Sequence, residues 1–155
     1  EAYCCLGTTI RQAGSQSAFK AVDLDAVLAF ARAARAAGAR RFTVVSSLGA
    51  SPRSSNFYSR VKGEMEAAVA GLGFESLVIA RPSLLAGDRA SLGQPHRRGE
   101  KLALWLSGPI AALMPRRLRP IDAATVARGM TVALQQQRPG VRIVESAELH
   151  ELGQD

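Results

Sequence analysis

Cysteine is scarce in this sequence, which has two among its 155 residues, the adjacent Cys4 and Cys5. Both fall in an apolar stretch that we predict to be a strand. Neighbouring strand residues point to opposite faces, so a disulfide between them is not expected. We predict that both are small buried hydrophobic residues without a redox role. The two histidines, His96 and His150, have no metal-ligand partners at a useful spacing, so the sequence predicts no metal site.

Long apolar runs are also missing. No stretch approaches the ~18 consecutive apolar residues of a membrane-spanning helix. The first residues, EAYCCLGTT, contain neither a basic leader nor the hydrophobic core of a signal peptide. A cytoplasmic location is therefore the default expectation.

Aromatic residues make up 5% of the chain, although the formal net charge is +7. A basic protein is a candidate for nucleic-acid binding. Here, however, the arginines are scattered and no aromatic residues lie among them to stack on bases. Most of the arginines are therefore interpreted as a solvated surface, and no nucleic-acid partner is expected.

The pattern of apolar residues predicts an α/β protein with one domain over residues 1–155. Residues 2–6, 42–45, 77–80 and 141–144 are expected as strands. A loop at 14–18 should precede a helix over 24–37, capped by Asp23. A helix reaching residue 72 should begin after Ser55 or Asn56, and Asp122 should cap a helix over 123–136. The remaining expectations are a polar loop at 86–100, an apolar helix at 101–114, a basic loop at 115–120 and a polar tail from residue 145.

The most informative stretch is FTVVSSLGASPRSSNFYSRVK, residues 42–62. A strand ends in Ser46 and Ser47, and the helix that follows carries Tyr58 and Lys62 one turn apart on one face. An ammonium beside a phenol stabilises the phenolate, which suits the pair to proton transfer. A serine at the carboxyl end of the strand would face the same place, because open α/β sheets bind their ligands there.

These motifs resemble the active site of the short-chain dehydrogenase/reductase superfamily, which combines a YxxxK motif with an upstream serine. The resemblance extends to YCCLGTT near the start and to the RP turn at Arg81 and Pro82, and it covers nearly the whole chain. Within the superfamily, the sequence most resembles an atypical subgroup, the Tat-interacting oxidoreductase-like proteins and their bacterial relatives. The implied fold is a doubly wound parallel sheet (Rossmann-like), lacking its first βαβ unit. No G-x-G-x-x-G occurs in the sequence. We therefore expect the chain to be the carboxyl-terminal part of a longer or truncated protein.

The resemblance implies an NAD(P)-dependent oxidoreductase that moves hydride between a nicotinamide and a carbonyl or alcohol. Tyr58 would be the general acid and base, Lys62 would support it and bind the ribose, and Ser47, ahead of Ser46, would polarise the substrate oxygen. The implied cofactor contacts are Leu6, Gly7, Thr8, Tyr58, Lys62, Pro82 and Leu85. The choice between NAD and NADP stays open, because the residues that read the ribose 2′ position belong to the absent unit.

The sequence is also compatible with functions other than this enzyme activity. The full-length protein would turn over a small-molecule substrate, whereas the fragment alone is expected to be inactive. An NAD(P)H-binding regulator or scaffold with a protein partner or as a homodimer is a second possibility, and a sugar-nucleotide epimerase or dehydratase is a third. Arg81 is interpreted as a surface ion-pair residue, and Arg89 and Arg97 as part of a solvated loop rather than an anion site.

Overall fold

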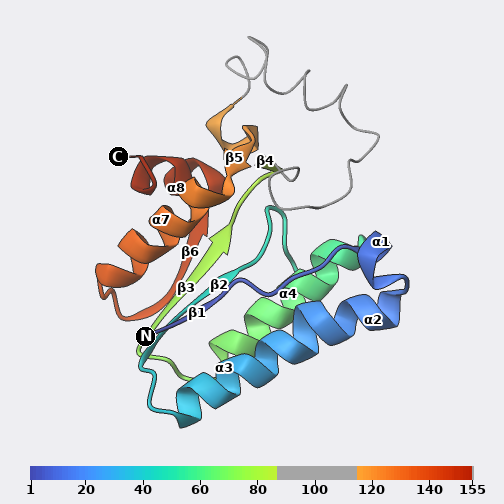
Figure 1. Cartoon of the computed structure of the whole chain (residues 1–155), viewed down its shortest axis with the longest axis horizontal. Coiled ribbons are helices and arrows are strands. Elements are labelled where there is room, and N and C mark those ends of the chain that lie inside the picture. Colours follow the sequence, from blue (N-terminus) through green and yellow to red (C-terminus); the bar gives the residue numbers. More distant parts are fainter. Residues whose placement is uncertain (87–114, 155) are drawn as a thin grey trace.

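The computed structural model describes residues 1–86 and 115–154, and a four-stranded sheet lies at its centre (Figure 1). The strands follow the order β1 (Ala2–Cys4), β2 (Arg41–Val45), β3 (Ser76–Arg81) and β6 (Gly140–Glu145). All three pairings are parallel, with Ala2 beside Phe42 and Val45 beside Ala80. The carboxyl ends of these strands therefore share one edge of the sheet. The predicted α/β class with a Rossmann-like parallel sheet is confirmed.

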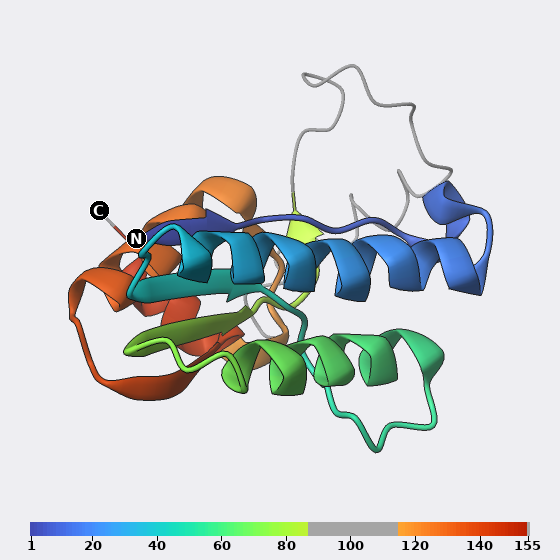
Figure 2. The ribbon, with the colours of Figure 1, turned by 90° about the horizontal axis from the view of Figure 1, so that it is seen from below.

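Helices cover both faces of the sheet (Figures 1 and 2). On one face, α3 (Val27–Ala36) and α4 (Phe57–Ala70) enclose a core made by Val27, Ala31, Phe42, Val44, Met65, Val69, Leu77 and Ile79. On the other face, α7 (Ala123–Gln135) and α8 (Ser146–Leu152) enclose Val78, Ala80, Val126, Met130, Leu134, Val144 and Leu149. Successive residues of β3 alternate between these cores, as the pleat of a strand requires.

Several helix ends lie where the local sequence predicts them. The amide of Ser59 donates to Oδ1 of Asn56 at 3.1 Å, so Asn56 caps α4. In the same way, the amide of Thr125 donates to Oδ1 of Asp122 at 2.9 Å, so Asp122 caps α7. The predicted strands at 42–45, 77–80 and 141–144 lie within β2, β3 and β6.

The first helical segment begins earlier than predicted. The chain forms α1 (Ile10–Ala13) and then α2 (Gln16–Lys20), which runs through a π-helical stretch, η1 (Ala21–Ala26), into α3. The cap of α2 is Ser15, whose Oγ accepts from the amide of Ala18 at 3.1 Å. Both the loop predicted at 14–18 and the role of Asp23 as an amino cap are therefore wrong. Asp23 lies inside the helical segment and is fully buried, because its carboxylate contacts a residue of α4.

Smaller elements were also missed. Residues from 145 on, predicted as a polar tail, include α8, because its Leu149 is buried against α7. Strands β4 (Leu85–Ala86) and β5 (Ile121–Asp122) form a second, two-stranded sheet, and η2 (Arg116–Leu118) lies within the predicted basic loop. Cys4 is buried as predicted, but Cys5 is exposed, so that half of the cysteine prediction is wrong.

Some predictions concern residues outside the part of the chain that the structure describes. These are the loop beyond residue 86, with Arg89, His96 and Arg97, and the apolar helix at 101–114. Within residues 1–86 and 115–154, no helix is long and apolar enough to cross a membrane.

Candidate active site

The turn after β1 and the serines after β2 lie beside the carboxyl edge of the sheet. β1 ends at Cys4 and leads into Leu6, Gly7 and Thr8, and β2 ends at Val45 and leads into Ser46 and Ser47. This edge is where open α/β sheets place their ligands. The sequence-predicted residues of these two turns therefore share one side of the molecule.

Lys62 is buried and paired with a carboxylate. It lies on α4, one turn after Tyr58, and its side chain is 4% exposed. Its Nζ lies 2.7 Å from Oδ1 of Asp23, whose side chain is 1% exposed. A buried ammonium is costly without a partner, and Asp23 supplies the opposite charge. Lys62 is therefore held in the interior rather than solvated as an ordinary surface lysine.

Asp23 also holds the turn that follows β1. Its second oxygen, Oδ2, accepts from the backbone amide of Thr8 at 2.8 Å. Gly7 passes so close that a Cβ built on it would lie 3.4 Å from Oδ1 of Asp23 and 3.8 Å from Nζ of Lys62. Gly7, Thr8 and Lys62, all predicted as site residues, are thus brought together by a residue that sequence reasoning assigned to a helix cap. A signal was present, since an aspartate four residues before the buried Val27 falls on the core side of the helix.

Tyr58 lies in the first turn of α4 and is half-buried. Its ring packs on the buried ring of Phe19 with centroids 5.5 Å apart, and Phe57 contacts the same ring at 5.8 Å. Such aromatic contacts fix the orientation of a ring. Tyr58 is therefore a packed residue on the same face of α4 as Lys62, not a freely solvated one.

The two serines after β2 continue the strand pattern. The amide of Ser46 donates to the carbonyl of Ala80 at 2.7 Å, and that of Leu48 donates to the carbonyl of Pro82 at 2.9 Å. By this alternation, Ser46 shares the sheet face of Val44, and Ser47 shares that of Val45. Both hydroxyl oxygens are buried, and neither has a hydrogen-bond partner among the described residues. The preference for Ser47 over Ser46 as the site serine stays a prediction.

The other predicted cofactor contacts are more widely spread. Leu6 is 44% exposed beside Gly7, and Leu85 is 40% exposed in β4. Pro82 is buried directly after β3. The structure thus joins Gly7, Thr8 and Lys62 by short distances, while no hydrogen bond or ion pair among the described residues joins Ser47, Pro82 or Leu85 to them.

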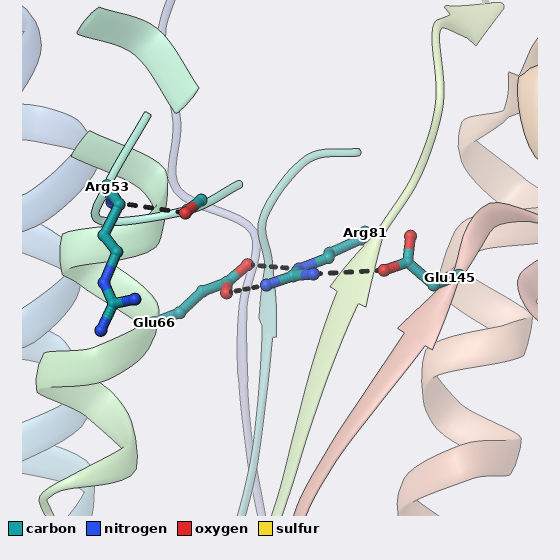
Figure 3. A network of polar contacts seen from close by, with 5 residues as sticks. Arg53, Glu66, Arg81 and Glu145 are labelled. Carbon is teal, nitrogen blue, oxygen red and sulfur yellow. Dashed lines mark hydrogen bonds and ion pairs between the residues drawn. The ribbon is translucent and has the colours of Figure 1, made fainter. Parts of the chain in front are cut away.

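Arg81, at the end of β3, joins three elements of the sheet and its covering helix (Figure 3). Its Nε and Nη2 donate to the two carboxylate oxygens of Glu66 on α4, at 2.9 and 2.6 Å. Its Nη1 donates to Glu145 of β6 at 3.2 Å. The hydrogen bonds to Glu66 raise the pKa of Arg81 above its ordinary value, so the guanidinium is always charged. Arg81 forms an ion pair as predicted, but the pair with Glu66 is largely buried and not at the surface, since the two side chains are 18% and 8% exposed. The pair fixes the start of the RP turn.

Other reactive groups in the described part of the chain give no competing site. Burial raises the pKa of the Cys4 thiol, which disfavours a reactive thiolate. Within residues 1–86 and 115–154, no group of three or more histidine, cysteine, aspartate or glutamate residues could hold a metal ion.

Comparison with known proteins places the chain in a family, although no family model matches it. It is 38% identical to "Protein HTATIP2" of Rattus norvegicus over 99% of this chain and 61% of that protein. It is 34% identical to "Protein FMP52-1, mitochondrial" of Scheffersomyces stipitis over 97% of this chain and 68% of that protein. The chain belongs to the HTATIP2 and FMP52 family. "Protein FMP52, mitochondrial" of Candida albicans is 35% identical over 87% of this chain and 57% of that protein.

The relatives confirm the expected kinship with the Tat-interacting proteins and correct another expectation. The chain spans roughly two thirds of their length, 61% of the rat protein and 68% of the Scheffersomyces one. Six fungal relatives are named as mitochondrial proteins. This contradicts the cytoplasmic location expected from the start of the sequence, and that prediction is wrong. It rested on the absence of a leader, and such an absence carries no information about location.

Proposed function

We propose that this HTATIP2 and FMP52 family member is an NAD(P)-dependent oxidoreductase of the short-chain dehydrogenase/reductase type. The observation that carries the proposal is the buried Lys62, one helical turn from Tyr58 and within reach of the turn formed by Gly7 and Thr8. A lysine and a tyrosine so placed at the carboxyl edge of a parallel sheet suit proton transfer to a bound ligand. The Rossmann-like sheet and the family relationship support a nucleotide cofactor.

The residues around this edge fit the nicotinamide half of such a cofactor. Gly7 has no side chain over the ion pair, Leu6 offers an exposed apolar surface, and two buried hydroxyl groups lack partners among the described residues. Leu6, Gly7, Thr8, Pro82 and Leu85 would hold the cofactor. Within the described part of the chain, no glycine-rich loop is available for the pyrophosphate.

The chain's own residues would do the following work. A bound nicotinamide nucleotide supplies or accepts the hydride. Tyr58 donates the proton of its hydroxyl group to the carbonyl oxygen during reduction, and takes a proton from the alcohol in the reverse direction. Ser47 donates a hydrogen bond to the same substrate oxygen and stabilises the negative charge that develops there. Lys62, whose ammonium is held by Asp23, would bind the ribose of the nucleotide.

The test is turnover of a panel of carbonyl compounds, including sugar nucleotides, by the natural gene product that carries this chain. Tyr58→Phe should lower kcat by about a hundredfold or more, since general acid–base groups contribute 10²–10⁴. Nucleotide affinity should stay within about threefold of the parent value, because the ring remains. The matched control is Tyr3→Phe, since Tyr3 is exposed on the edge strand β1 and bonds to Glu1. Turnover by Tyr58→Phe equal to that of the parent would refute the assignment.

A second function is favoured by one observation. The ammonium of Lys62 is already paired with Asp23 and almost fully buried, which suits a fixed binding element as well as a catalytic one. We therefore also consider a nucleotide-binding regulator without turnover. Tight binding of NADH or NADPH, measured by calorimetry, with no product from any member of the panel would support the regulator over the enzyme.

A further inference from the structure

A single buried carboxylate joins three segments that the sequence keeps apart. Asp23 contacts Lys62 of α4 through Oδ1 at 2.7 Å and the amide of Thr8 through Oδ2 at 2.8 Å, and it belongs to η1 itself. It is fully buried. An isolated carboxylate in such a place would be strongly unfavourable, so both of its oxygens need the partners they have.

The helix is locally altered at this carboxylate. The π-helical stretch Ala21–Ala26 lies between the α-helical segments α2 and α3, and Asp23 is its third residue. π-Helical turns are rare, and they are frequent at functional sites. The extra residue in the turn changes the direction in which the side chains of η1 point. Here that change coincides with a carboxylate directed at Lys62.

Stability alone is a weak explanation for the pair. Buried ion pairs contribute little net stability compared with well-packed hydrophobic residues, because desolvation of both charges offsets their attraction. The adjoining turn also has a feature that packing does not require. The backbone of Gly7 lies directly against the Asp23–Lys62 pair. Neither its backbone conformation nor the space around it requires a glycine, because its φ is not positive and a Cβ would meet only ordinary contact distances.

We propose that Asp23 is a positioning residue that couples Lys62 to the turn at Gly7 and Thr8. The inference rests on the proposed function for its meaning, since Lys62 and the turn are the groups that would meet the nucleotide. Asp23 binds both the backbone amide of Thr8, in the turn that would lie along the nucleotide, and the ammonium of Lys62, one helical turn from Tyr58. A shift of either one changes the position of the other.

The experiment compares Asp23→Asn with Asp25→Asn in the natural gene product. Asp25 lies in the same π-helical stretch and is exposed, so its replacement removes the same charge from the solvent side. Two readouts need no nucleotide: the rate at which formaldehyde and borohydride methylate Lys62, followed by mass spectrometry, and the hydrogen exchange of the Thr8 amide. A third is the dissociation constant of NADPH and of NADH.

In Asp23→Asn, methylation of Lys62 and exchange at Thr8 should each be at least fivefold faster than in the parent. Nucleotide binding should weaken at least fivefold, and Asp25→Asn should stay within twofold on every readout. A folded Asp23→Asn with all three values within twofold of the parent would overturn the proposal. If the parent binds neither nucleotide, the proposed function falls, and the coupling is then decided by the methylation and exchange rates alone.

A second variant covers the case in which Asp23→Asn does not fold. Asp23→Leu combined with Lys62→Met removes both buried charges and leaves no unpaired ion in the interior. This double variant should fold and should exchange the Thr8 amide at least tenfold faster than the parent, because the acceptor of that amide is gone. Exchange at the parent rate would show that Asp23 does not hold the turn.

Discussion

The guanidinium of Arg81 faces the carboxylate of Glu66 through two parallel hydrogen bonds, Nε to Oε1 at 2.9 Å and Nη2 to Oε2 at 2.6 Å (Figure 3). The side chain of Glu66 is 8% exposed and that of Arg81 18%. A two-bond contact between fixed planes gives direction as well as energy. It joins α4, which carries Tyr58 and Lys62, to the end of β3 where the RP turn begins.

Glu66→Gln should lower the free energy of unfolding by about 2 kcal/mol, because the charged hydrogen bonds are lost while Arg81 stays charged. Glu64→Gln is the matched control on the same helix. Glu64 pairs with Lys20 at 3.7 Å and its side chain is 36% exposed, so the change should be below about 1 kcal/mol. Urea unfolding of both variants measures the difference. Equal losses in the two variants would mean that the Arg81 pair is no stronger than a surface pair.

Gly63 lets the loop after β2 approach α4. A Cβ built on Gly63 would lie 2.2 Å from the carbonyl carbon of Ser51 and 2.3 Å from the nitrogen of Pro52. Gly63→Ala should therefore displace that loop and destabilise the protein by about 3 kcal/mol. Gly71→Ala, at the end of the same helix, would meet its nearest atom at 3.5 Å and should be neutral or slightly stabilising. Thermal unfolding distinguishes the two, and a neutral Gly63→Ala would show that the loop can move freely.

The features that the sequence predicts well are local ones. Asn56 and Asp122 cap their helices as expected, because a cap needs only an amide two or three residues ahead. The strand over 77–80 is also correct, since a continuous apolar run is typical of a strand covered on both faces. In each case, the information lies within one short stretch of the sequence.

The features that the sequence does not predict depend on distant partners. Asp23 has the residue type of an amino cap, but its carboxylate is paired with Lys62 of another helix and with Thr8. The largely polar stretch from residue 145 on forms α8 because its apolar Leu149 is buried against α7. Neither outcome follows from propensity, because tertiary contacts override local preference.

Asp122 gives a prediction for acid conditions. Hydrogen bonds from the hydroxyl group and the amide of Thr125 hold the pKa of the Asp122 carboxyl below its usual value of 3.8. A lowered pKa means that its contribution is complete above the pKa of the unfolded chain and is lost as the pH falls through the folded value. Asp122→Ala should cost about 1 kcal/mol at pH 7, and the cost should shrink below about pH 4. Asp122→Asn, which can still cap, should cost only a few tenths at pH 7. Denaturant unfolding from pH 7 to pH 3 measures both, and a cost that stays constant with pH would contradict the role of the ionised carboxylate.

The two serines after β2 allow the last distinction. Ser46 is 4% exposed and its amide donates to the carbonyl of Ala80, whereas Ser47 is half-buried and lies between Ser46 and Leu48, which also donates to the β3 side. Each hydroxyl group is buried without a partner among the described residues, so replacing either by alanine should change the free energy of unfolding by less than about 0.5 kcal/mol. If Ser47 donates to the substrate oxygen, Ser47→Ala should lower kcat by about a hundredfold, the usual effect of removing such a donor. Ser46→Ala should then change kcat less than about threefold, because Ser46 would not contact the substrate oxygen. The reverse order, with Ser46→Ala the slower variant, would make Ser46 the site serine, on the sheet face covered by α4, which carries Tyr58 and Lys62. It would also show that the sheet face of a serine identifies the site residue better than its position in the sequence motif does.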